Sequence, residues 1–272
     1  SLMVYVLVGL RRMNAKSNEA SIKYFVMGGA SAAIYLYGVA LVYGALGTTK
    51  LAQIATMLNE SGSTLLANPI LITGIVLLLV GFLFKVAAAP FHMWTPDVYE
   101  GAPSNITSYM ATALKAAVFA SFVRLSLGIL GDEGVSLLGD VKPLIHGVLW
   151  WLALITMVVG NVVALMQTNI KRLLAYSAIA HTGYLLVGIL AGPTVGYAGI
   201  LFYLVAYVAM NIGAFALISL FAGKDDSALT LSNVVGLGKR HPWVAAALTV
   251  FLLSLGGFPP TAGFVGKYYL FS

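Results

Sequence analysis

The stretch PILITGIVLLLVGFLFKVAAAPFHMWTPDVYEGAPS, residues 69–104, decides the fold class because it joins a long apolar run to a proline-rich break. The run at 69–89 is long enough to cross a bilayer, since about 20 helical residues rising about 1.5 Å each span the hydrocarbon layer. Lys85 lies near the end of this run. Proline lacks an N–H donor and collides with the carbonyl four residues earlier, so we expect the helix to break near Pro90.

Apolar runs of similar length recur along the whole chain. Of its 272 residues, 60% are hydrophobic and only 9% are charged, whereas about a quarter of the residues of a soluble domain are charged. Backbone groups in lipid must be paired within helices or closed barrels, so the sequence predicts an all-α polytopic membrane helical bundle. After an apolar stub at 2–10, the predicted spans are 20–46, 69–89, 104–130, 144–166, 172–192, 195–222 and 243–271.

A second break is predicted in SLGGFPPTAGFVGK, residues 254–267. Irregular backbone at membrane depth is tolerated only where protein or a water-filled cavity pairs the freed groups. Interruptions in corresponding segments of two halves of a chain point to the working site of a transporter. Because Lys85 precedes the first break and Lys267 follows the second, the pattern favours ion transport.

Lysines inside the apolar runs are the candidate functional residues. Lys115 lies eleven residues after Ser104, which places it about 16 Å into its helix and near the centre of the bilayer. Burial disfavours the charged ammonium, so a lysine there can both accept and release a proton, whereas an arginine stays protonated. The predicted proton path consists of Lys85, Lys115, Lys267 and Lys23.

Structural alternatives remain open for these lysines. Lys23 lies one turn after Glu19 and either belongs to the path or only pairs with that acid. Lys85 and Lys267 either exchange protons or only cap carbonyls freed at the breaks. Asp97 and Glu100 fall in the first break, and no acid is evident deep in a complete span, so the lysines lack an obvious counter-charge.

His181 and the basic residues at helix ends allow two interpretations each. His181, ten residues after Lys171, lies near mid-membrane and either relays protons or hydrogen-bonds a neighbouring helix. Lys171, Arg172 and Arg124 are interpreted as topological anchors, with Lys171 as an alternative proton relay.

The loops indicate how the chain is oriented. If every run spans, the loops at 11–18, 90–103, 167–171 and 223–241 share one side. With the adjoining Arg172, these loops carry more Lys and Arg residues than the loops of the opposite side. Cytoplasmic loops carry an excess of these residues, so we expect the side of these four loops to be cytoplasmic.

Other site chemistries find little support in the composition. The chain has no cysteine, which excludes disulfides and cysteine-ligated iron–sulfur clusters. The four histidines lie far apart, so no metal site is predicted, and no nucleotide fingerprint is present. The basic residues are scattered through apolar runs, which argues against nucleic-acid binding.

Four long strings carry a family resemblance. KVAAAPFHMWTPDVYEGAPS (85–104), ATALKAAVFASFVRL (111–125), GNVVALMQTNIKRLLAYSAIAHTGYLLVG (160–188) and LSLGGFPPTAGFVGKYYLF (253–271) resemble the subunit N family of proton-pumping NADH:quinone oxidoreductase, respiratory complex I. The similarity runs from Ser1 to Ser272. The wider family includes the other antiporter-like subunits of complex I and the multisubunit cation/proton antiporters.

The resemblance implies an antiporter-like fold of two inverted five-helix repeats, each with one broken helix. Residues 1–130 would be the end of the first repeat, with a stub, three spans and a break near 90–103. Residues 131–272 would be most of the second repeat, with four spans and a break near 256–261. We expect the sequence to be a fragment cut at both ends, unable to pump alone, with a glutamate partner of Lys23 just ahead of Ser1.

The resemblance also implies a function and its partners. It implies a proton-translocating subunit in the bacterial plasma membrane whose proton-path lysines match Lys23, Lys85, Lys115 and Lys267. NAD, FMN, iron–sulfur clusters and quinone would be bound by partner subunits of the complex, with no cofactor or metal on this chain. Two other functions remain open, namely a subunit of a multisubunit cation/proton antiporter and a non-pumping structural scaffold.

Overall fold

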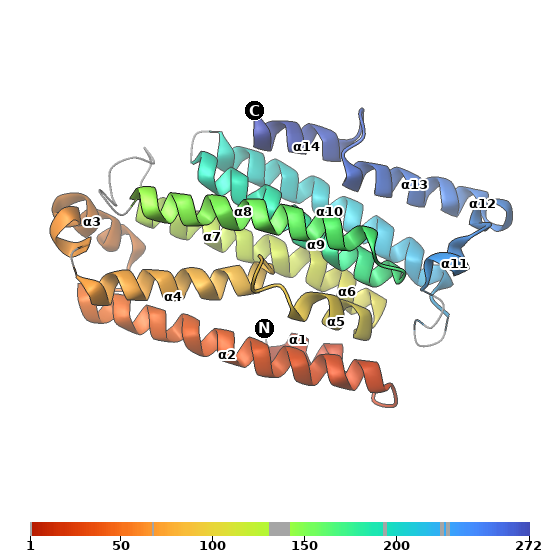
Figure 1. Cartoon of the computed structure of the whole chain (residues 1–272), viewed down its shortest axis with the longest axis horizontal. Helices are drawn as coiled ribbons and strands as arrows, with labels where there is room; N and C mark the ends of the chain where they lie inside the picture. Colours follow the sequence, from red (N-terminus) through yellow and green to blue (C-terminus); the bar gives the residue numbers. More distant parts are fainter. Residues whose placement is uncertain (1, 67, 131–141, 193–194, 224–225, 227–228) are drawn as a thin grey trace.

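The computed structural model is a bundle of long helices that lie side by side along one axis (Figure 1). It describes residues 2–66, 68–130, 142–192, 195–223, 226 and 229–272. Within these residues there is no β-strand, and one isolated bridge joins Asn169 to Thr230. The prediction of an all-α bundle is therefore confirmed.

The helices of the described residues follow one another with short connections. They are α1 (Leu2–Val8), α2 (Ala15–Leu46), α3 (Leu51–Leu66), α4 (Pro69–Val86), α5 (Trp94–Gly101), α6 (Ser104–Tyr109), a π-helical turn (Met110–Leu114), α7 (Lys115–Leu130), α8 (Lys142–Leu165), α9 (Ile170–Ala191), α10 (Gly196–Phe221), α11 (Leu231–Val234), α12 (Leu237–Arg240), α13 (Pro242–Gly256) and α14 (Ala262–Phe271).

Six of the described helices are long and apolar enough to cross a membrane. They are α2, α4, the continuous helix Ser104–Leu127, α8, α9 and α10, and each falls largely within a predicted span. Asparagine begins three of them, because Asn14, Asn68 and Asn169 accept backbone N–H groups of α2, α4 and α9 with their side chains. The chain is a multi-pass membrane protein.

The seventh predicted span, 243–271, is divided in two. Helix α13 ends at Gly256 and α14 begins at Ala262, with Pro259 and Pro260 between them. The predicted break is confirmed. Because α13 has 15 residues, it rises only about 22 Å, which is too short to cross about 30 Å of hydrocarbon alone.

Four helices of the described residues lie outside the predicted runs, namely α3, α5, α11 and α12. The first break contains α5, and the seven residues 87–93 separate it from the end of α4 at Val86. Helix α3 lies between the first two spans, and its Ile54 and Leu58, one turn apart, pack with residues of α2 and α4. Seven of the 16 residues of α3 are Gln, Thr, Asn, Glu or Ser, so a search for continuous apolar runs does not find it.

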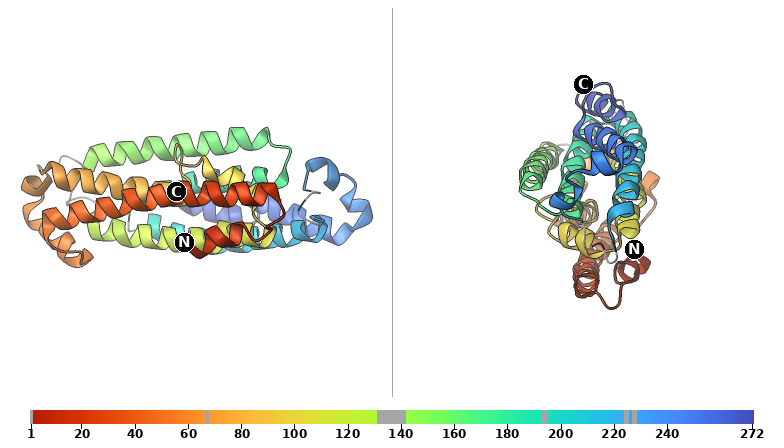
Figure 2. Two further views of the ribbon diagram at one scale, coloured as in Figure 1. Left: turned by 90° about the horizontal axis from the view of Figure 1, so that it is seen from below. Right: turned by 90° about the vertical axis from the view of Figure 1, so that its right-hand side faces the viewer.

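Helix α9 lies at the centre of the packing. It contacts α8, α10, α5 and α14, and 67% of its span is buried, more than in the other spans. In the end-on view α8 lies at one edge, while the N-terminal and C-terminal helices lie at opposite ends (Figure 2). Polar side chains on α9 are therefore held inside the bundle.

The loops predicted to share one side meet at one end of the bundle. Asp226 pairs with Arg11 and with Lys171, and Lys16 pairs with Glu100. These contacts join all four predicted segments, so their common side is confirmed. The assignment of this side to the cytoplasm stays a prediction.

Candidate functional site

Lys115 is buried in the middle of the bundle, as its predicted depth required. Its residue is 5% exposed, and its Nζ donates to the carbonyl oxygen of Ala178 and, over 2.9 Å, to Oγ1 of Thr182. Both acceptors are neutral and belong to α9. No carboxylate of the described residues lies within salt-bridge distance of this amine.

The π-helical turn Met110–Leu114 comes directly before Lys115. A π-helical turn inserts an extra residue into the helix, and such turns occur mostly at functional sites. The sequence contained no signal for this turn.

Thr182 connects Lys115 to the first break. Its hydroxyl, which accepts from Lys115, donates over 2.7 Å to the carbonyl oxygen of Val86. Val86 is the last residue of α4, and Ala87 after it adopts a left-handed conformation with φ 60°. The freed carbonyl therefore finds its partner on α9, as irregular backbone at membrane depth requires.

Lys85 occupies the last turn of α4, next to Val86. It is half-buried, and within the described part of the chain its amine has no hydrogen-bond or ion-pair partner. The structural alternative, in which Lys85 caps carbonyls of the break, finds no support in these contacts. The carbonyl of Val86 is capped by Thr182 instead.

His181 lies beside Thr182 on α9 and is 2% exposed. Its Nδ1 is hydrogen-bonded to the hydroxyl of Tyr203 on α10. The interpretation of His181 as a hydrogen-bonding partner of a neighbouring helix is confirmed, and its role as a relay stays a prediction. Its ring centroid lies 5.0 Å from that of Tyr207 and 5.4 Å from that of Tyr184.

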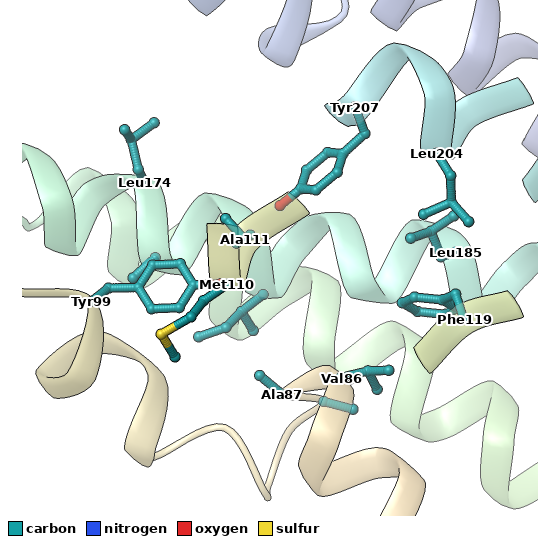
Figure 3. Close-up of a cluster of buried hydrophobic side chains, with 14 of the residues drawn as sticks. Val86, Ala87, Tyr99, Met110, Ala111, Phe119, Leu174, Leu185, Leu204 and Tyr207 are labelled. Carbon is teal, nitrogen blue, oxygen red and sulfur yellow. The ribbon is translucent and has the colours of Figure 1, made fainter. Parts of the chain in front are cut away.

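Two tyrosines extend this group to both lysines of the interior. The Nζ of Lys115 lies 5.5 Å from the ring centroid of Tyr207, and the Nζ of Lys267 lies 4.8 Å from that of Tyr184. Figure 3 shows Tyr207 directed from α10 toward Ala111, with Val86 and Ala87 at the end of α4 nearby. The hydroxyl of Tyr207 is buried without a hydrogen-bond partner among the described residues.

Lys267 caps the end of α13. Its Nζ donates over 3.0 Å to the carbonyl of Leu255 and over 2.9 Å to that of Gly256. The structural alternative considered for Lys267 is therefore present in the fold, although it does not exclude proton exchange. Gly257, with φ 84°, leaves room for this side chain, because a Cβ there would lie 2.9 Å from the Lys267 Cδ.

Lys23 lies apart from these residues, in an ion cluster at the end of the bundle. Its Nζ is 2.7 Å from Oε1 of Glu19 and 2.8 Å from Oδ2 of Asp97. Arg172 binds Asp97 over 2.8 Å and Glu100 over 3.0 Å. Asp97 thus supplies a counter-charge that sequence reasoning had missed.

The acids of this cluster remain charged. Partial burial would raise the pKa of Asp97, but hydrogen bonds from Lys23 and Arg172 outweigh it and hold the pKa below its usual value. The pKa of Glu100 is lowered against its burial by Lys16 and Arg172 in the same way. A pocket of about 210 Å³ opens between these side chains.

The spacing of Asp97 and Glu100 could have identified them as paired acids on one helix face. They are three residues apart, so they share a face of α5. The interpretation of this segment as a loop hid that signal.

Lys171 is buried and ion-paired, unlike a headgroup anchor. Its side chain is 1% exposed, and its Nζ lies 2.9 Å from Oδ2 of Asp226. It also donates to the carbonyl of Ala102. Arg172, by contrast, is partly exposed in the first turn of α9, and Arg124 is exposed within α7.

The predicted residues therefore form two groups. The interior group joins Lys115 to Thr182 and, through aromatic rings, to His181 and Lys267, with Lys85 next to Val86 at the edge of this group. Lys23 belongs to the ion cluster, and Lys171 pairs separately with Asp226. Among the described residues, no group of three or more His, Asp or Glu side chains is arranged to hold a metal ion.

Known proteins resemble this chain over its whole length. The family model described as NADH:quinone oxidoreductase/Mrp antiporter, TM, matches residues 1–272. NADH-quinone oxidoreductase subunit N of Trichlorobacter lovleyi is 52% identical over 100% of this chain and 54% of its own length. The same subunit of Salinibacter ruber is 48% identical over 100% of this chain and 52% of its own length.

Solved structures of respiratory membrane complexes share the fold. A chain of respiratory complex I from Thermus thermophilus matches with a TM-score of 0.75 and 36% identity, covering 98% of this chain and 54% of that one. A chain of the membrane-bound sulfane sulfur reductase, an archaeal respiratory complex, matches with a TM-score of 0.87 and 27% identity, covering 99% of this chain and 52% of that one.

The chain spans about half the length of the curated relatives it matches. The resemblance to the subunit N family drawn from the sequence is confirmed by these relatives. Since the family model covers every residue, the chain belongs to the NADH:quinone oxidoreductase/Mrp antiporter transmembrane family.

Proposed function

We propose that this chain forms part of a membrane subunit that translocates protons for an NADH:quinone oxidoreductase. The observation that carries the proposal is the buried amine of Lys115, whose acceptors among the described residues are neutral. One of them is the Thr182 hydroxyl, which also donates to the carbonyl of Val86 beside Lys85. An amine that is buried away from bulk solvent without a carboxylate partner loses much of the stabilisation of its charged form. Such an amine can take up and release a proton during turnover.

The proton route runs from Lys85 past Thr182 to Lys115, and from there past Tyr207 and His181 to Lys267. Between Lys115 and Lys267 the contacts along this route are made by aromatic rings, at centroid distances of 4.8–5.8 Å. Hydrogen bonds among the described residues therefore leave gaps in the route. Internal water fills such gaps where polar groups need partners. The buried hydroxyl of Tyr207, which has none among the described residues, offers one such position.

Electron transfer belongs to partner subunits in this proposal. The relatives are named as subunits of NADH-quinone oxidoreductase, so NAD, FMN, iron–sulfur clusters and quinone would be bound by other chains of the complex. The chain itself would lie in the bacterial plasma membrane against other membrane-arm subunits. Its own contribution is the proton path.

The experiment uses the full-length protein in its assembled complex, reconstituted into sealed vesicles. Lys115→Met should lower proton uptake driven by NADH oxidation while leaving the amount of assembled complex unchanged. The matched control is Lys50→Met, because Lys50 is exposed at the start of α3. Proton pumping at the wild-type level by a Lys115→Met, Lys85→Met double variant would overturn the proposal.

The same vesicles separate the two alternative functions. Sodium-dependent exchange that needs no quinone would favour a cation/proton antiporter. Loss of assembly at unchanged pumping per complex would favour a structural scaffold.

A further inference from the structure

Asp226 joins three distant segments of the chain at the end of the bundle. Its side chain is 7% exposed, and its carboxylate accepts from the backbone N–H of Ser104 over 3.1 Å and from the Ser104 hydroxyl over 2.9 Å. Lys171 donates to the same oxygen over 2.9 Å, and Arg11 lies 3.2 Å away. The proton route proposed above uses none of these contacts.

The contacts with Ser104 make Asp226 a helix cap supplied from another part of the chain. Ser104 begins the continuous helix that carries Lys115, and Pro103 before it offers no side-chain cap. The first N–H groups of a helix lack hydrogen-bond partners within the helix. A carboxylate at this position accepts from them, and its negative charge is stabilised by the positive end of the helix dipole. Asp226, 122 residues away in sequence, fills this position.

Lys171 ties a second helix to the same carboxylate. It lies in the first turn of α9, so the first turns of two parallel helices meet at Asp226. Lys115 follows Ser104 by eleven residues, and Thr182 follows Lys171 by eleven residues. The hydrogen bond between Lys115 and Thr182 therefore forms eleven residues along each helix from their common attachment.

We propose that Asp226 is a positioning residue for the proton path, which fixes the register of the Lys115 helix against α9 so that Lys115 meets Thr182. The inference rests on the proposed function. Asp226 acts through the two helices and lies far from the transferred proton. Asp226, which follows α10, would thereby control the hydrogen bond between Lys115 and Thr182, two residues on other helices.

The first arm of the test replaces Asp226 in the full-length protein within its assembled complex. Asp226→Asn removes the charge that binds Lys171 and should lower the number of protons pumped per NADH oxidised, while NADH oxidation continues. Asparagine can still accept hydrogen bonds from Ser104 as a helix cap, so the expected loss of pumping comes from the missing charge that holds Lys171. Asp226→Glu restores the charge and should recover most of the pumping, and Glu60→Gln, an exposed acid of α3, should change nothing.

The second arm asks whether Asp226 acts through Thr182. Thr182→Val should itself lower pumping, and adding Asp226→Asn to it should cause little further loss, because both changes remove the same contact. Effects that multiply independently would overturn the inference, as would wild-type pumping by Asp226→Asn. A merely structural role would lower the amount of complex and leave the protons pumped per NADH unchanged.

Ser104→Ala keeps the test decisive if Asp226→Asn does not assemble. It removes the hydroxyl contact and leaves the ion pair between Asp226 and Lys171 intact. Ser104→Ala should lower the number of protons pumped per NADH less than Asp226→Asn does, and it should cause no further loss when Thr182→Val is already present. If Ser104→Ala leaves the number of protons per NADH unchanged, the inference is overturned. If Lys115→Met pumps normally, the proposed function fails; if it does not pump but the Asp226 variants do, the inference alone fails.

Discussion

Thr182 of α9 donates a hydrogen bond of 2.7 Å to the carbonyl of Val86, the last residue of α4. The same hydroxyl accepts from Lys115. One side chain therefore holds both the end of the broken helix and the buried amine. This relationship makes Thr182 the point at which the first break and the interior lysine can influence each other.

Thr182→Val should lower both stability and proton pumping. The change keeps the shape of the side chain but leaves the Val86 carbonyl without its partner, which costs about 2 kcal/mol for a buried group. Thermal unfolding of the purified complex and proton uptake in vesicles would measure the two effects. Thr249→Val is the control, because Thr249 is exposed on α13; equal effects of the two substitutions would contradict the prediction.

Asp97→Asn should make the protein less sensitive to acid. The pKa of Asp97 in the fold lies below its ordinary value of 3.8, so its ion pairs stabilise the fold above that value and this stabilisation is lost as the pH falls through the folded pKa. The variant should unfold at a lower temperature at neutral pH, and its unfolding temperature should fall less than that of the wild type below about pH 4.

Unfolding temperatures measured in detergent between about pH 7 and about pH 3 test this expectation. Glu60→Gln, which neutralises an exposed acid of α3, should retain the wild-type pH dependence. An Asp97→Asn curve parallel to that of the wild type would show that its ion pairs with Lys23 and Arg172 do not contribute.

Gly257→Ala tests the cap that Lys267 places on α13. A non-glycine residue in the left-handed conformation costs about 1 kcal/mol, and the added Cβ would lie 2.9 Å from the Lys267 Cδ. The lysine must then move away from the carbonyls of Leu255 and Gly256. We expect a lower unfolding temperature together with weaker pumping.

Gly256→Ala is a close control for that experiment. Gly256 is the last residue of α13, and a Cβ there would meet nothing within 4 Å. Alanine favours a helix over glycine by up to about 1 kcal/mol, so stability should be unchanged or higher. If Gly257→Ala and Gly256→Ala have the same unfolding temperature and the same pumping, the contacts of Lys267 contribute to neither.

The features that the sequence predicted are those that depend on local chemistry. Proline placed the breaks near Pro90 and at Pro259–Pro260, and counting residues from Ser104 placed Lys115 in the interior. Apolar run length located the spans. Each of these inferences needed only neighbouring residues and the thickness of a bilayer.

The features that the sequence did not predict depend on tertiary contacts. Thr182 and Val86 are 96 residues apart, Lys23 and Asp97 are 74 apart, and Asp226 and Ser104 are 122 apart. Nothing in a single sequence identifies such pairs. The π-helical turn before Lys115 was missed for a related reason, because packing rather than residue type selects where an extra residue is inserted.

Lys171→Met separates the two interpretations of Lys171. The side chain is buried against Asp226, and removing one partner of a buried ion pair costs about 3 kcal/mol because the other charge is left without compensation. Arg11 still contacts Asp226 in the variant, which limits the loss. We expect a clearly lower unfolding temperature, with pumping per assembled complex reduced only as far as the helix register is disturbed.

Lys239→Met, at an exposed position in α12, should match the wild type. If Lys171 relays protons instead, pumping should be abolished at an unfolding temperature close to that of the wild type, and that result would contradict the structural role.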